Sequence, residues 1–493
     1  MTNQHTPDTR EDAASKLPAL HVLMVMGWTY LPPAEALAMR GSERSVVLAP
    51  VLREWLAAHR FDFKGQQHPL SESGINQVIK AITATKLNEG LIAANEAIYK
   101  QLTLGITVDE FVGGDKTSVT VPLVDWANVD ANLFHVTEEL SVERPAGMGR
   151  YRPDVVCYVN GLPLVVIEAK RPTSSSAEKS MVAEGISQHN RNQKVQGIQS
   201  LYAYSQLLLS ISGTDARYGT TDTPKKFWGS WTEEEITEAQ MQDVKSTPLS
   251  EAQKALLFAD KPRWAKDDFD RLHSGLVLPT EQDRMIISLL RPDRLLDFTR
   301  RFIFYDRGTK KIAARYQQFG GVKAILSQVA KQKPDGSREG GVIWHTTGSG
   351  KSNLMVLLTK ALLLDPDLAS SRVIIVTDRV DLEKQLAATF LTGGAFGSVV
   401  ATKKDGEKAK VQSGRDLAKR IGSGDERIIF TLLQKFNSAT KLPECKNTSD
   451  RLIVLVDEGH RSQGGENHER MRQALPNAAF IALGASWTAR PRN

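Results

Sequence analysis

Two groups of residues in this chain have the types and spacing needed for metal-dependent phosphate chemistry. The first is Asp154 followed by Glu168 and Lys170, in the pattern Pro-Asp…Glu-x-Lys. Two carboxylates can hold Mg²⁺, which polarises a phosphate and lowers the pKa of a bound water. A lysine beside them can orient that water or stabilise the developing negative charge. The pattern therefore predicts a phosphodiester-cleaving centre with Asp154 and Glu168 as metal ligands.

The elements that must position these side chains are two apolar segments, 155–159 and 164–167, which predict β-strands. Asn160-Gly161 between them is typical of a tight hairpin turn. The tight turn would place Glu168 out of line with Asp154, on the other face of the sheet. A three-residue turn, or one bulge in a strand, would bring the two carboxylates level. We therefore predict a departure from the tight-turn register; the alternative is a surface hairpin with charged ends.

The residues after the hairpin add a possible DNA contact. The run Gln-His-Asn-Arg-Asn at 188–192 predicts the start of a helix that lies against the hairpin. From that helix, Gln188 and Arg191 could contact a DNA backbone. A polar helix face without such a role is the alternative.

The second group is a glycine-rich loop between a strand candidate at 342–344 and a helix candidate at 354–364. Such a loop exposes backbone N–H groups to phosphate oxygens, with a lysine on the β- and γ-phosphates and a hydroxyl on Mg²⁺. The residues predicted to bind ATP here are Thr347, Gly348, Ser349, Gly350, Lys351 and Ser352. The first position of the generic loop is normally glycine, and in this chain it is His345.

An acidic pair completes the nucleotide site. The apolar segment 452–456 predicts a buried strand that ends at Asp457 and Glu458. The carboxyl end of a strand in the same sheet is where such a fold needs its Mg²⁺ partner. We expect Asp457 to hold the metal and Glu458 to activate the attacking water. Further strand candidates at 373–376 and 428–430 are apolar on both faces, as a doubly covered parallel sheet requires.

Length and composition limit the class of protein in which these sites lie. A chain of 493 residues predicts two or three domains, and 41% hydrophobic residues are typical of a globular protein. The two cysteines match no metal-ligand spacing and favour a reducing cytoplasm. The polar N-terminus is not a signal peptide, and no apolar run is long enough to cross a bilayer. The net charge of +6 only weakly favours a nucleic-acid partner.

Periodic patterning divides the chain into four predicted segments. They are a disordered leader at 1–20, an α/β nuclease domain at 21–212, a linker with an irregular excursion at 213–285, and a motor lobe at 286–493. Helix candidates in the nuclease domain are 51–56, 75–82 and 91–104. Another in the motor lobe is 382–390, and polar loops are expected at 331–341 and 403–410.

With these motifs in hand, the chain resembles the restriction (R, motor) subunit of type I restriction–modification enzymes. The resemblance covers about residues 21–480 and rests on six stretches of sequence: 151–172, 315–319, 346–352, 377–385, 431–436 and 457–463. It implies a PD-(D/E)xK nuclease-like mixed sheet followed by a RecA-like parallel-sheet lobe of a superfamily 2 helicase. It also implies Mg²⁺ and ATP as cofactors and double-stranded DNA as substrate. The implied partners are a methyltransferase subunit and a specificity subunit.

The resemblance further assigns roles to individual residues. Gln317 would recognise adenine, and His460 would couple hydrolysis to movement. Arg379 lies in the stretch that resembles the motor's second, DNA-contacting motif, and Gln434 lies in the next one. We assign both to DNA binding by this resemblance.

Two departures from the family pattern affect these expectations. The family nuclease often has Gln-x-x-x-Tyr after the catalytic lysine, whereas the matching stretch here ends in Asn192. The second departure follows Ile481, where a Thr-Gly-Thr-Pro-like motif is replaced by Gly-Ala-Ser-Trp-Thr-Ala-Arg-Pro. We expect that the chain is truncated, lacks the second motor lobe, and binds ATP weakly and hydrolyses it poorly alone.

Three readings stay open at this stage. The leading one is the restriction subunit of an ATP-dependent DNA endonuclease. The others are a stand-alone DNA repair nuclease-helicase and an inactive, truncated DNA-binding fragment. Metal-dependent nicking of DNA would separate the first two from the third.

Overall fold

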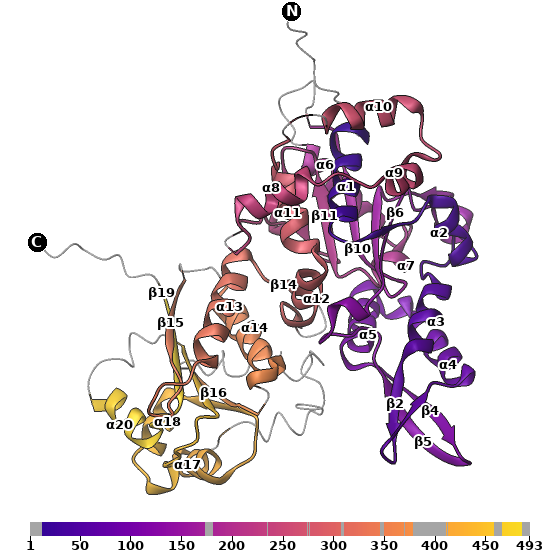
Figure 1. Ribbon diagram of the computed structural model, residues 1–493. Coiled ribbons are helices and arrows are strands. Elements are labelled where there is room, and N and C mark those ends of the chain that lie inside the picture. Colours follow the sequence, from indigo (N-terminus) through magenta and orange to yellow (C-terminus); the bar gives the residue numbers. More distant parts are fainter. Residues whose placement is uncertain are drawn as a thin grey trace, which may run out of the picture. The chain divides into compact units, whose positions relative to one another are not determined.

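The computed structural model describes residues 12–172, 181–233, 235–273, 275, 277–306, 310–345, 350–368, 370–377, 411, 413–457 and 466–485. Its contacts divide the chain into two compact units (Figure 1). The first unit comprises Met1–Arg300 and Gly308–Ala313, and the second comprises Arg301–Arg307 and Ala314–Asn493. The predicted start of the motor lobe at residue 286 is therefore too early, because residues up to 300 belong to the first unit. Among the described residues, no helix could span a membrane.

A six-stranded mixed sheet forms the centre of the first unit, in the order β1-β6-β9-β10-β11-β12. β10 pairs antiparallel with β9 on one side and parallel with β11 on the other. Every residue of β9 and β10 is buried, so both faces of the sheet are covered at its centre. This explains their unbroken apolar runs. The strands are β1 (Thr29–Tyr30), β6 (Phe134–Glu138), β9 (Val155–Val159), β10 (Leu162–Ala169), β11 (Leu207–Ile211) and β12 (Ala216–Gly219).

Helices and small hairpins surround this sheet. The predicted helices at 51–56, 75–82 and 91–104 are confirmed as α3, α4 and α5. The first helices are α1 (Leu17–Val25), α2 (Pro33–Arg40), α3 (Ala49–Ala58), α4 (Glu72–Thr83), α5 (Leu91–Leu104), α6 (Met181–Asn192) and α7 (Gln199–Tyr202). The remaining short strands are β2 (Arg60–Phe63), β3 (Gln66–Pro69), β4 (Ile106–Val112), β5 (Asp115–Val121), β7 (Val142–Glu143), β8 (Arg150–Tyr151) and β14 (Lys310–Ala313).

The prediction of a disordered leader at 1–20 is wrong from residue 12 onward. Asp12–Lys16 forms a π-helix, η1, that continues into α1, and Ser15 and Lys16 are buried. Ser15 exchanges two hydrogen bonds with Gln282, at 2.7 and 2.8 Å. Polar residues that look solvated in the sequence are thus ordered by partners far along the chain.

The predicted linker at 213–285 is also wrong, because the segment is built into the first unit. It contributes β12 to the central sheet, followed by the helices α8 (Glu238–Ser246), α9 (Glu251–Phe258) and α10 (Arg263–Leu272) and the start of α11 (Glu281–Leu290). The helix α12 (Pro292–Arg301) comes after this segment. Capping boxes begin α8 at Thr237, α9 at Ser250 and α11 at Thr280. Their Ser/Thr-x-x-Gln/Asp spacing is visible in the sequence and could have predicted these helices.

A five-stranded parallel sheet forms the second unit, in the order β15-β19-β18-β16-β17. The four strands predicted here are confirmed. Their observed bounds, with β13 and β19, are β13 (Ile303–Asp306), β15 (Gly341–His345), β16 (Arg372–Thr377), β17 (Ile428–Leu432), β18 (Leu452–Asp457) and β19 (Ala479–Ala485). The helices are α13 (Tyr316–Ala330), α14 (Lys351–Leu364), α17 (Gly414–Ser423), α18 (Leu433–Ala439) and α20 (Glu466–Ala474). The predicted helix at 382–390 and the loop at 403–410 lie outside the described residues.

Candidate active sites

The β9–β10 hairpin keeps a tight turn and then shifts its register. Asn160 and Gly161 form the turn with positive φ values of 50° and 81°. Leu162 pairs with Val159, but beyond Pro163 the register slips by one residue, so that Ile167 lies opposite Val155. The slip brings Glu168 level with Asp154. The predicted departure from the tight-turn register is confirmed, in its form of a bulge rather than a longer turn.

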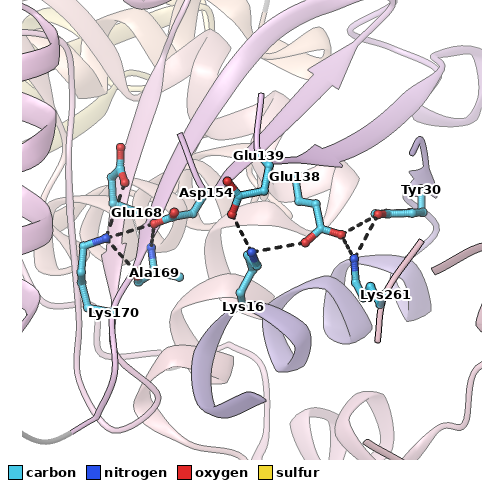
Figure 2. Close-up of polar contacts among 9 residues, drawn as sticks. All are labelled: Lys16, Tyr30, Glu138, Glu139, Asp154, Glu168, Ala169, Lys170 and Lys261. Carbon is cyan, nitrogen blue, oxygen red and sulfur yellow. Dashed lines mark hydrogen bonds and ion pairs between the residues drawn. The ribbon is translucent and has the colours of Figure 1, made fainter. Parts of the chain in front are cut away.

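The three predicted nuclease residues lie together at the end of this hairpin (Figure 2). The Ala169 amide donates to Oδ2 of Asp154 at 2.8 Å, which ties the first carboxylate to the strand that carries the second. Lys170 Nζ donates to the same Oδ2 at 3.2 Å and lies 3.8 Å from Oε2 of Glu168. Its position follows from strand alternation, which puts Glu168 and Lys170 on one face.

The site is nearly closed to solvent, and this shapes its electrostatics. Glu168 is fully buried, and its Oε2 has no hydrogen-bond partner. Burial, followed by the charge of Asp154, raises the pKa of the Glu168 carboxyl well above its ordinary value, while Lys170 opposes the rise. A buried carboxylate oxygen that lacks a donor and costs energy to ionise is a site suited to a cation.

Helix α6 covers this face of the sheet at close range. A Cβ on Gly185 would lie 2.2 Å from Oγ of Ser210 and 3.5 Å from Cβ of Glu168, so glycine is required for the approach. At the end of α6, Asn192 Nδ2 donates to Oε1 of Glu168 at 3.4 Å. The prediction that 188–192 opens a helix is wrong, since these residues close α6. No local pattern in the sequence predicts the contact between Asn192 and Glu168, a candidate metal ligand.

The two predicted DNA contacts on α6 differ in their surroundings. Arg191 is exposed, and its guanidinium carbon lies 5.2 Å from the ring centre of Tyr151. Arg144 lies over the same ring at 4.4 Å and donates to the backbone carbonyl of Gln196 at 2.8 Å. Arg191 is thus an exposed cation whose charge also lowers the pKa of the Glu168 carboxyl. Gln188 is half-buried.

A second buried ionic cluster, which the sequence did not predict, lies beside the hairpin (Figure 2). Lys16 Nζ lies 2.7 Å from Oε1 of Glu139 and 3.5 Å from Oε2 of Glu138. Glu138 also accepts from the Tyr30 hydroxyl at 2.5 Å and pairs with Lys261. Burial, followed by the charge of Glu138, raises the pKa of Tyr30, so its phenol stays a donor. The ion pairs of Lys16 thus hold the N-terminal segment against the end of β6.

The backbone of this cluster also supports the nuclease hairpin. The Glu139 amide donates to the carbonyl of Asp154 at 3.0 Å, and the Leu140 amide donates to the carbonyl of Pro153 at 3.2 Å. Glu139 has a positive φ of 48°, a strained conformation for a residue with a Cβ. The segment that carries the ion pairs therefore fixes the backbone position of Asp154.

In the second unit, the predicted phosphate loop lies between β15 and α14. Gly350 adopts a left-handed conformation with φ of 84° and immediately precedes Lys351 and Ser352 at the first turn of α14. The N-terminus of a helix after a parallel strand is an anion-binding position. Thr347, Gly348 and Ser349 lie outside the described residues.

The glutamine beside this loop is not the predicted one. Gln317 is exposed at the start of α13, whereas Gln318 is buried. Gln318 accepts from the Arg315 amide at 2.9 Å and donates to the Gly350 carbonyl at 3.3 Å. Gln318 was not among the predicted residues, because the sequence alone does not determine which of two adjacent glutamines faces the loop from a helix.

Asp457 ends β18 and is buried, with β19 between β18 and β15. Its position at the carboxyl end of a strand in the sheet of the phosphate loop is the one predicted. Gln434 is exposed on α18. Three further residues with predicted roles lie outside the described part of the chain: Arg379, Glu458 and His460.

Known proteins resemble both units. The family model described as Type I restriction enzyme R protein N terminus matches residues 8–227, and the SWI2/SNF2 ATPase model matches residues 317–488. The HindI endonuclease subunit of Haemophilus influenzae, a type I restriction enzyme, is 30% identical over 492 residues, covering 94% of this chain and 41% of its own. The putative MjaIXP endonuclease subunit of Methanocaldococcus jannaschii is 28% identical, covering 85% of this chain and 37% of its own.

The chain thus spans about two fifths of the length of the curated relatives that it matches. Among solved structures, the UvsW helicase from Bacteriophage T4 aligns with 55% of this chain at 17% identity, with a TM-score of 0.27, which is too low to carry an argument. The two family matches and the relative aligned along 94% of the chain thus make this chain similar to type I restriction enzyme R proteins, with residues 317–488 similar to SWI2/SNF2 ATPases.

Proposed function

We propose that this chain carries the DNA-cleaving centre and an ATP-binding lobe of a type I, ATP-dependent DNA endonuclease. The observation that supports this most is the arrangement of Asp154, Glu168 and Lys170 on one hairpin end, with Lys170 Nζ 3.2 Å from one carboxylate and 3.8 Å from the other. A mixed sheet whose central hairpin presents these residues fits the PD-(D/E)xK nuclease type. The relatives that the chain resembles are named endonuclease subunits of type I restriction enzymes.

Asp154 and Glu168 are the residues that would hold Mg²⁺. Their oxygen donors suit a hard cation, and the buried Oε2 of Glu168 lacks a hydrogen-bond partner. Within the described ranges, no group of three His, Cys, Asp or Glu side chains is placed to hold a metal. Two carboxylates are nevertheless enough, because Mg²⁺ commonly keeps waters and substrate phosphates as its other ligands. The ion, when bound, would polarise the scissile phosphate and activate a water.

The remaining residues of the centre would bind and orient DNA. Lys170 would stabilise the negative charge that grows on the phosphate as it is attacked, since its ammonium already lies between the two carboxylates. Arg191 is exposed at the end of α6 and lies over Tyr151. It would pair with a phosphate of the DNA strand next to the one that is cleaved. Gln188, half-buried on the same helix, would add a second contact to the DNA backbone.

The second unit would bind ATP with Mg²⁺. Lys351 and Ser352 at the start of α14 would contact the terminal phosphates and the metal, and Asp457 would be the metal's acidic partner. Gly350 supplies the left-handed turn that lets the loop enter the helix. The match of residues 317–488 to SWI2/SNF2 ATPases supports this role. Thr347, Gly348, Ser349 and the general base Glu458 remain part of the proposal.

We further propose that the chain acts on double-stranded DNA in the cytoplasm together with methyltransferase and specificity subunits. The support is the similarity to proteins that are named endonuclease subunits of type I restriction enzymes. DNA contacts by Arg379 and Gln434 belong to the same proposal.

A cleavage assay tests the nuclease. Supercoiled plasmid is incubated with the purified chain and Mg²⁺, with and without ATP and with the partner subunits added. We expect nicking or cutting that disappears in Lys170→Ala and persists in Lys194→Ala, which removes an exposed lysine two residues after α6. Equal cleavage by wild type and Lys170→Ala would contradict the proposed centre.

A further inference from the structure

The side chain of Arg144 joins two surface segments that are far apart in the sequence. Its Nη1 donates to the Met148 carbonyl at 2.9 Å, within the loop between β7 and β8. Its Nε donates to the Gln196 carbonyl at 2.8 Å, in the turn that follows α6. The Arg144 amide also donates to the Gly149 carbonyl at 2.9 Å, which closes the loop on itself. One guanidinium therefore holds the β7–β8 loop beside the end of α6.

The same guanidinium lies over Tyr151, the last residue of β8. The guanidinium carbon of Arg144 is 4.4 Å from the centre of the Tyr151 ring, and that of Arg191 is 5.2 Å from it. The electron-rich face of an aromatic ring attracts a guanidinium, which can also stack on it. Arg191 is exposed, so without the ring its long side chain would be free to adopt many rotamers. The ring, with Arg144 packed on it, therefore restricts where the Arg191 charge lies.

Both segments lead directly to the cleavage centre. Tyr151 comes three residues before Asp154 on the same stretch of chain. Asn192, which follows Arg191, donates from Nδ2 to Oε1 of Glu168 at 3.4 Å. Each of the two candidate metal ligands is thus adjacent to one of the segments that Arg144 joins.

This surface keeps a positive charge after its ion pairs are counted. On the β7–β8 hairpin, Arg150 pairs with Glu43 at 2.5 Å, and Glu143 pairs with Arg44 at 3.0 Å. Within the described part of the chain, three arginines of the two segments form no ion pair: Arg144, Arg152 and Arg191. A polyanion next to a phosphodiester-cleaving centre is the partner that such a surface fits, and the DNA backbone is that polyanion.

We propose that the β7–β8 loop and the end of α6 form one binding surface for the phosphate backbone of DNA, in which Arg144 is a positioning residue. Arg144 uses two of its nitrogens on backbone carbonyls, and it holds the ring against which Arg191 reaches a phosphate. This inference rests on the proposed function, because it concerns the DNA bound at the same centre. Arginine is required, since lysine keeps the charge but lacks the planar fork that bonds to two carbonyls and stacks on a ring.

DNA affinity of a charge-conserving variant tests this role. Binding of a short fluorescein-labelled duplex is measured by anisotropy over a range of salt concentrations, with Mg²⁺ and in a Lys170→Ala parent that does not cut. We expect Arg144→Lys and Arg144→Ala to weaken binding by similar factors, about fivefold, because both lose the stacked fork. Arg191→Ala should weaken binding and lower the slope of log affinity against log salt by about 0.9, the share of one phosphate.

The control and the rescue come from neighbouring side chains. Arg44→Lys changes an exposed arginine that pairs with Glu143 on the same hairpin, and it should bind DNA as the parent does. Tyr151→Phe keeps the ring and should keep the affinity, whereas Tyr151→Leu should lose as much as Arg144→Lys. In an Arg191→Ala background, Arg144→Lys should cause no further loss, because it acts through Arg191.

Thermal unfolding of each variant shows whether it is folded, and if Arg144→Lys is not, the two Tyr151 variants decide the question. Parent-like binding by Arg144→Lys or Tyr151→Leu, additive losses with Arg191→Ala, or an equal loss in Arg44→Lys overturns the inference. If one of these results appears while the wild-type chain cuts plasmid and Lys170→Ala does not, the inference fails and the proposed nuclease stands. If the parent does not bind the duplex and the wild-type chain does not cut, both fail.

Discussion

The amide nitrogen of Ala169 donates a hydrogen bond to Oδ2 of Asp154 at 2.8 Å. The first carboxylate of the nuclease centre is therefore held by the backbone of the strand that bears the second, and the two move as one body. This coupling depends on the register slip after Pro163, and hence on the turn at Asn160 and Gly161.

Gly161→Ala tests the turn that sets this register. A Cβ at Gly161 would lie 2.5 Å from the Leu48 carbonyl, and the residue has a φ of 81°. Gly65 has the same φ of 81° but open space around its Cβ position. We expect Gly65→Ala to lower the free energy of unfolding by roughly 1–2 kcal/mol from left-handed strain alone. Gly161→Ala should cost clearly more in urea unfolding; equal losses would show that the close approach to Leu48 is unimportant.

The buried ion cluster gives a prediction about stability. Lys16→Met removes the buried cation between Glu138 and Glu139. Because Glu138 keeps its pair with Lys261 and Glu139 is partly exposed, the loss should be smaller than for an unpaired buried charge, at about 2 kcal/mol, as for a hydrogen bond to a charged group. Lys64→Met breaks an exposed pair with Asp115, which contributes less than about 1 kcal/mol. Thermal unfolding of the two variants checks the difference. Similar unfolding temperatures for Lys16→Met and Lys64→Met would mean that the ion pairs of Lys16 do not stabilise the N-terminal segment.

Acid should destabilise the first unit through His21. Burial, followed by the charge of His273, lowers the pKa of His21 from 6.5 to about 4, and Nε2 of His21 donates to the Thr247 carbonyl at 2.9 Å. Between about pH 4 and pH 6.5, the unfolded chain therefore binds a proton at His21 that the folded chain does not bind. Stability from neutral His21 is present above pH 6.5 and is lost, by on the order of 3 kcal/mol, as the pH falls to 4.

The variant His21→Gln keeps a donor for Thr247 but cannot titrate, so its unfolding free energy should depend less steeply on pH in this window. His68→Gln, at a half-buried histidine on β3, serves as the control. An unchanged pH dependence in His21→Gln would show that other groups govern the acid transition.

Nucleotide binding should depend on Gln318 more than on Gln317. Gln318 bridges Arg315 and Gly350, whereas Gln317 is exposed. We expect Gln318→Ala to weaken binding of a fluorescent ATP analogue by several-fold, roughly the loss of one or two hydrogen bonds. Gln317→Ala tests the adenine contact that the family resemblance assigns to Gln317. A larger loss of nucleotide affinity in Gln317→Ala than in Gln318→Ala would support that assignment instead.

Local patterns in the sequence predicted β9 and β10 of the first sheet and four strands of the second, because strands such as β9, β10, β16 and β18 are buried on both faces and form continuous apolar runs. The need for a register shift, by a longer turn or a bulge, followed from Asp154 and Glu168 alone. Its position is consistent with Pro163, which has no N–H for a strand ladder.

The parts that could not be predicted depend on contacts between distant residues. Lys16 is buried because its partners lie more than a hundred positions away at the end of β6, and no local pattern marks it. Asn192 reaches Glu168 only because α6 packs closely at Gly185. The helices after β12 are a different case, since their capping residues were present in the sequence and were overlooked.

The most direct test of the central claim is to locate a metal ion in the nuclease centre. A crystal structure of the chain soaked in Mn²⁺ would show anomalous scattering at the ion. The account predicts a peak about 2.0–2.2 Å from carboxylate oxygens of both Asp154 and Glu168. The same peak should be missing in Glu168→Gln. A wild-type crystal with Mn²⁺ bound elsewhere and none between these two carboxylates would contradict the proposed nuclease centre.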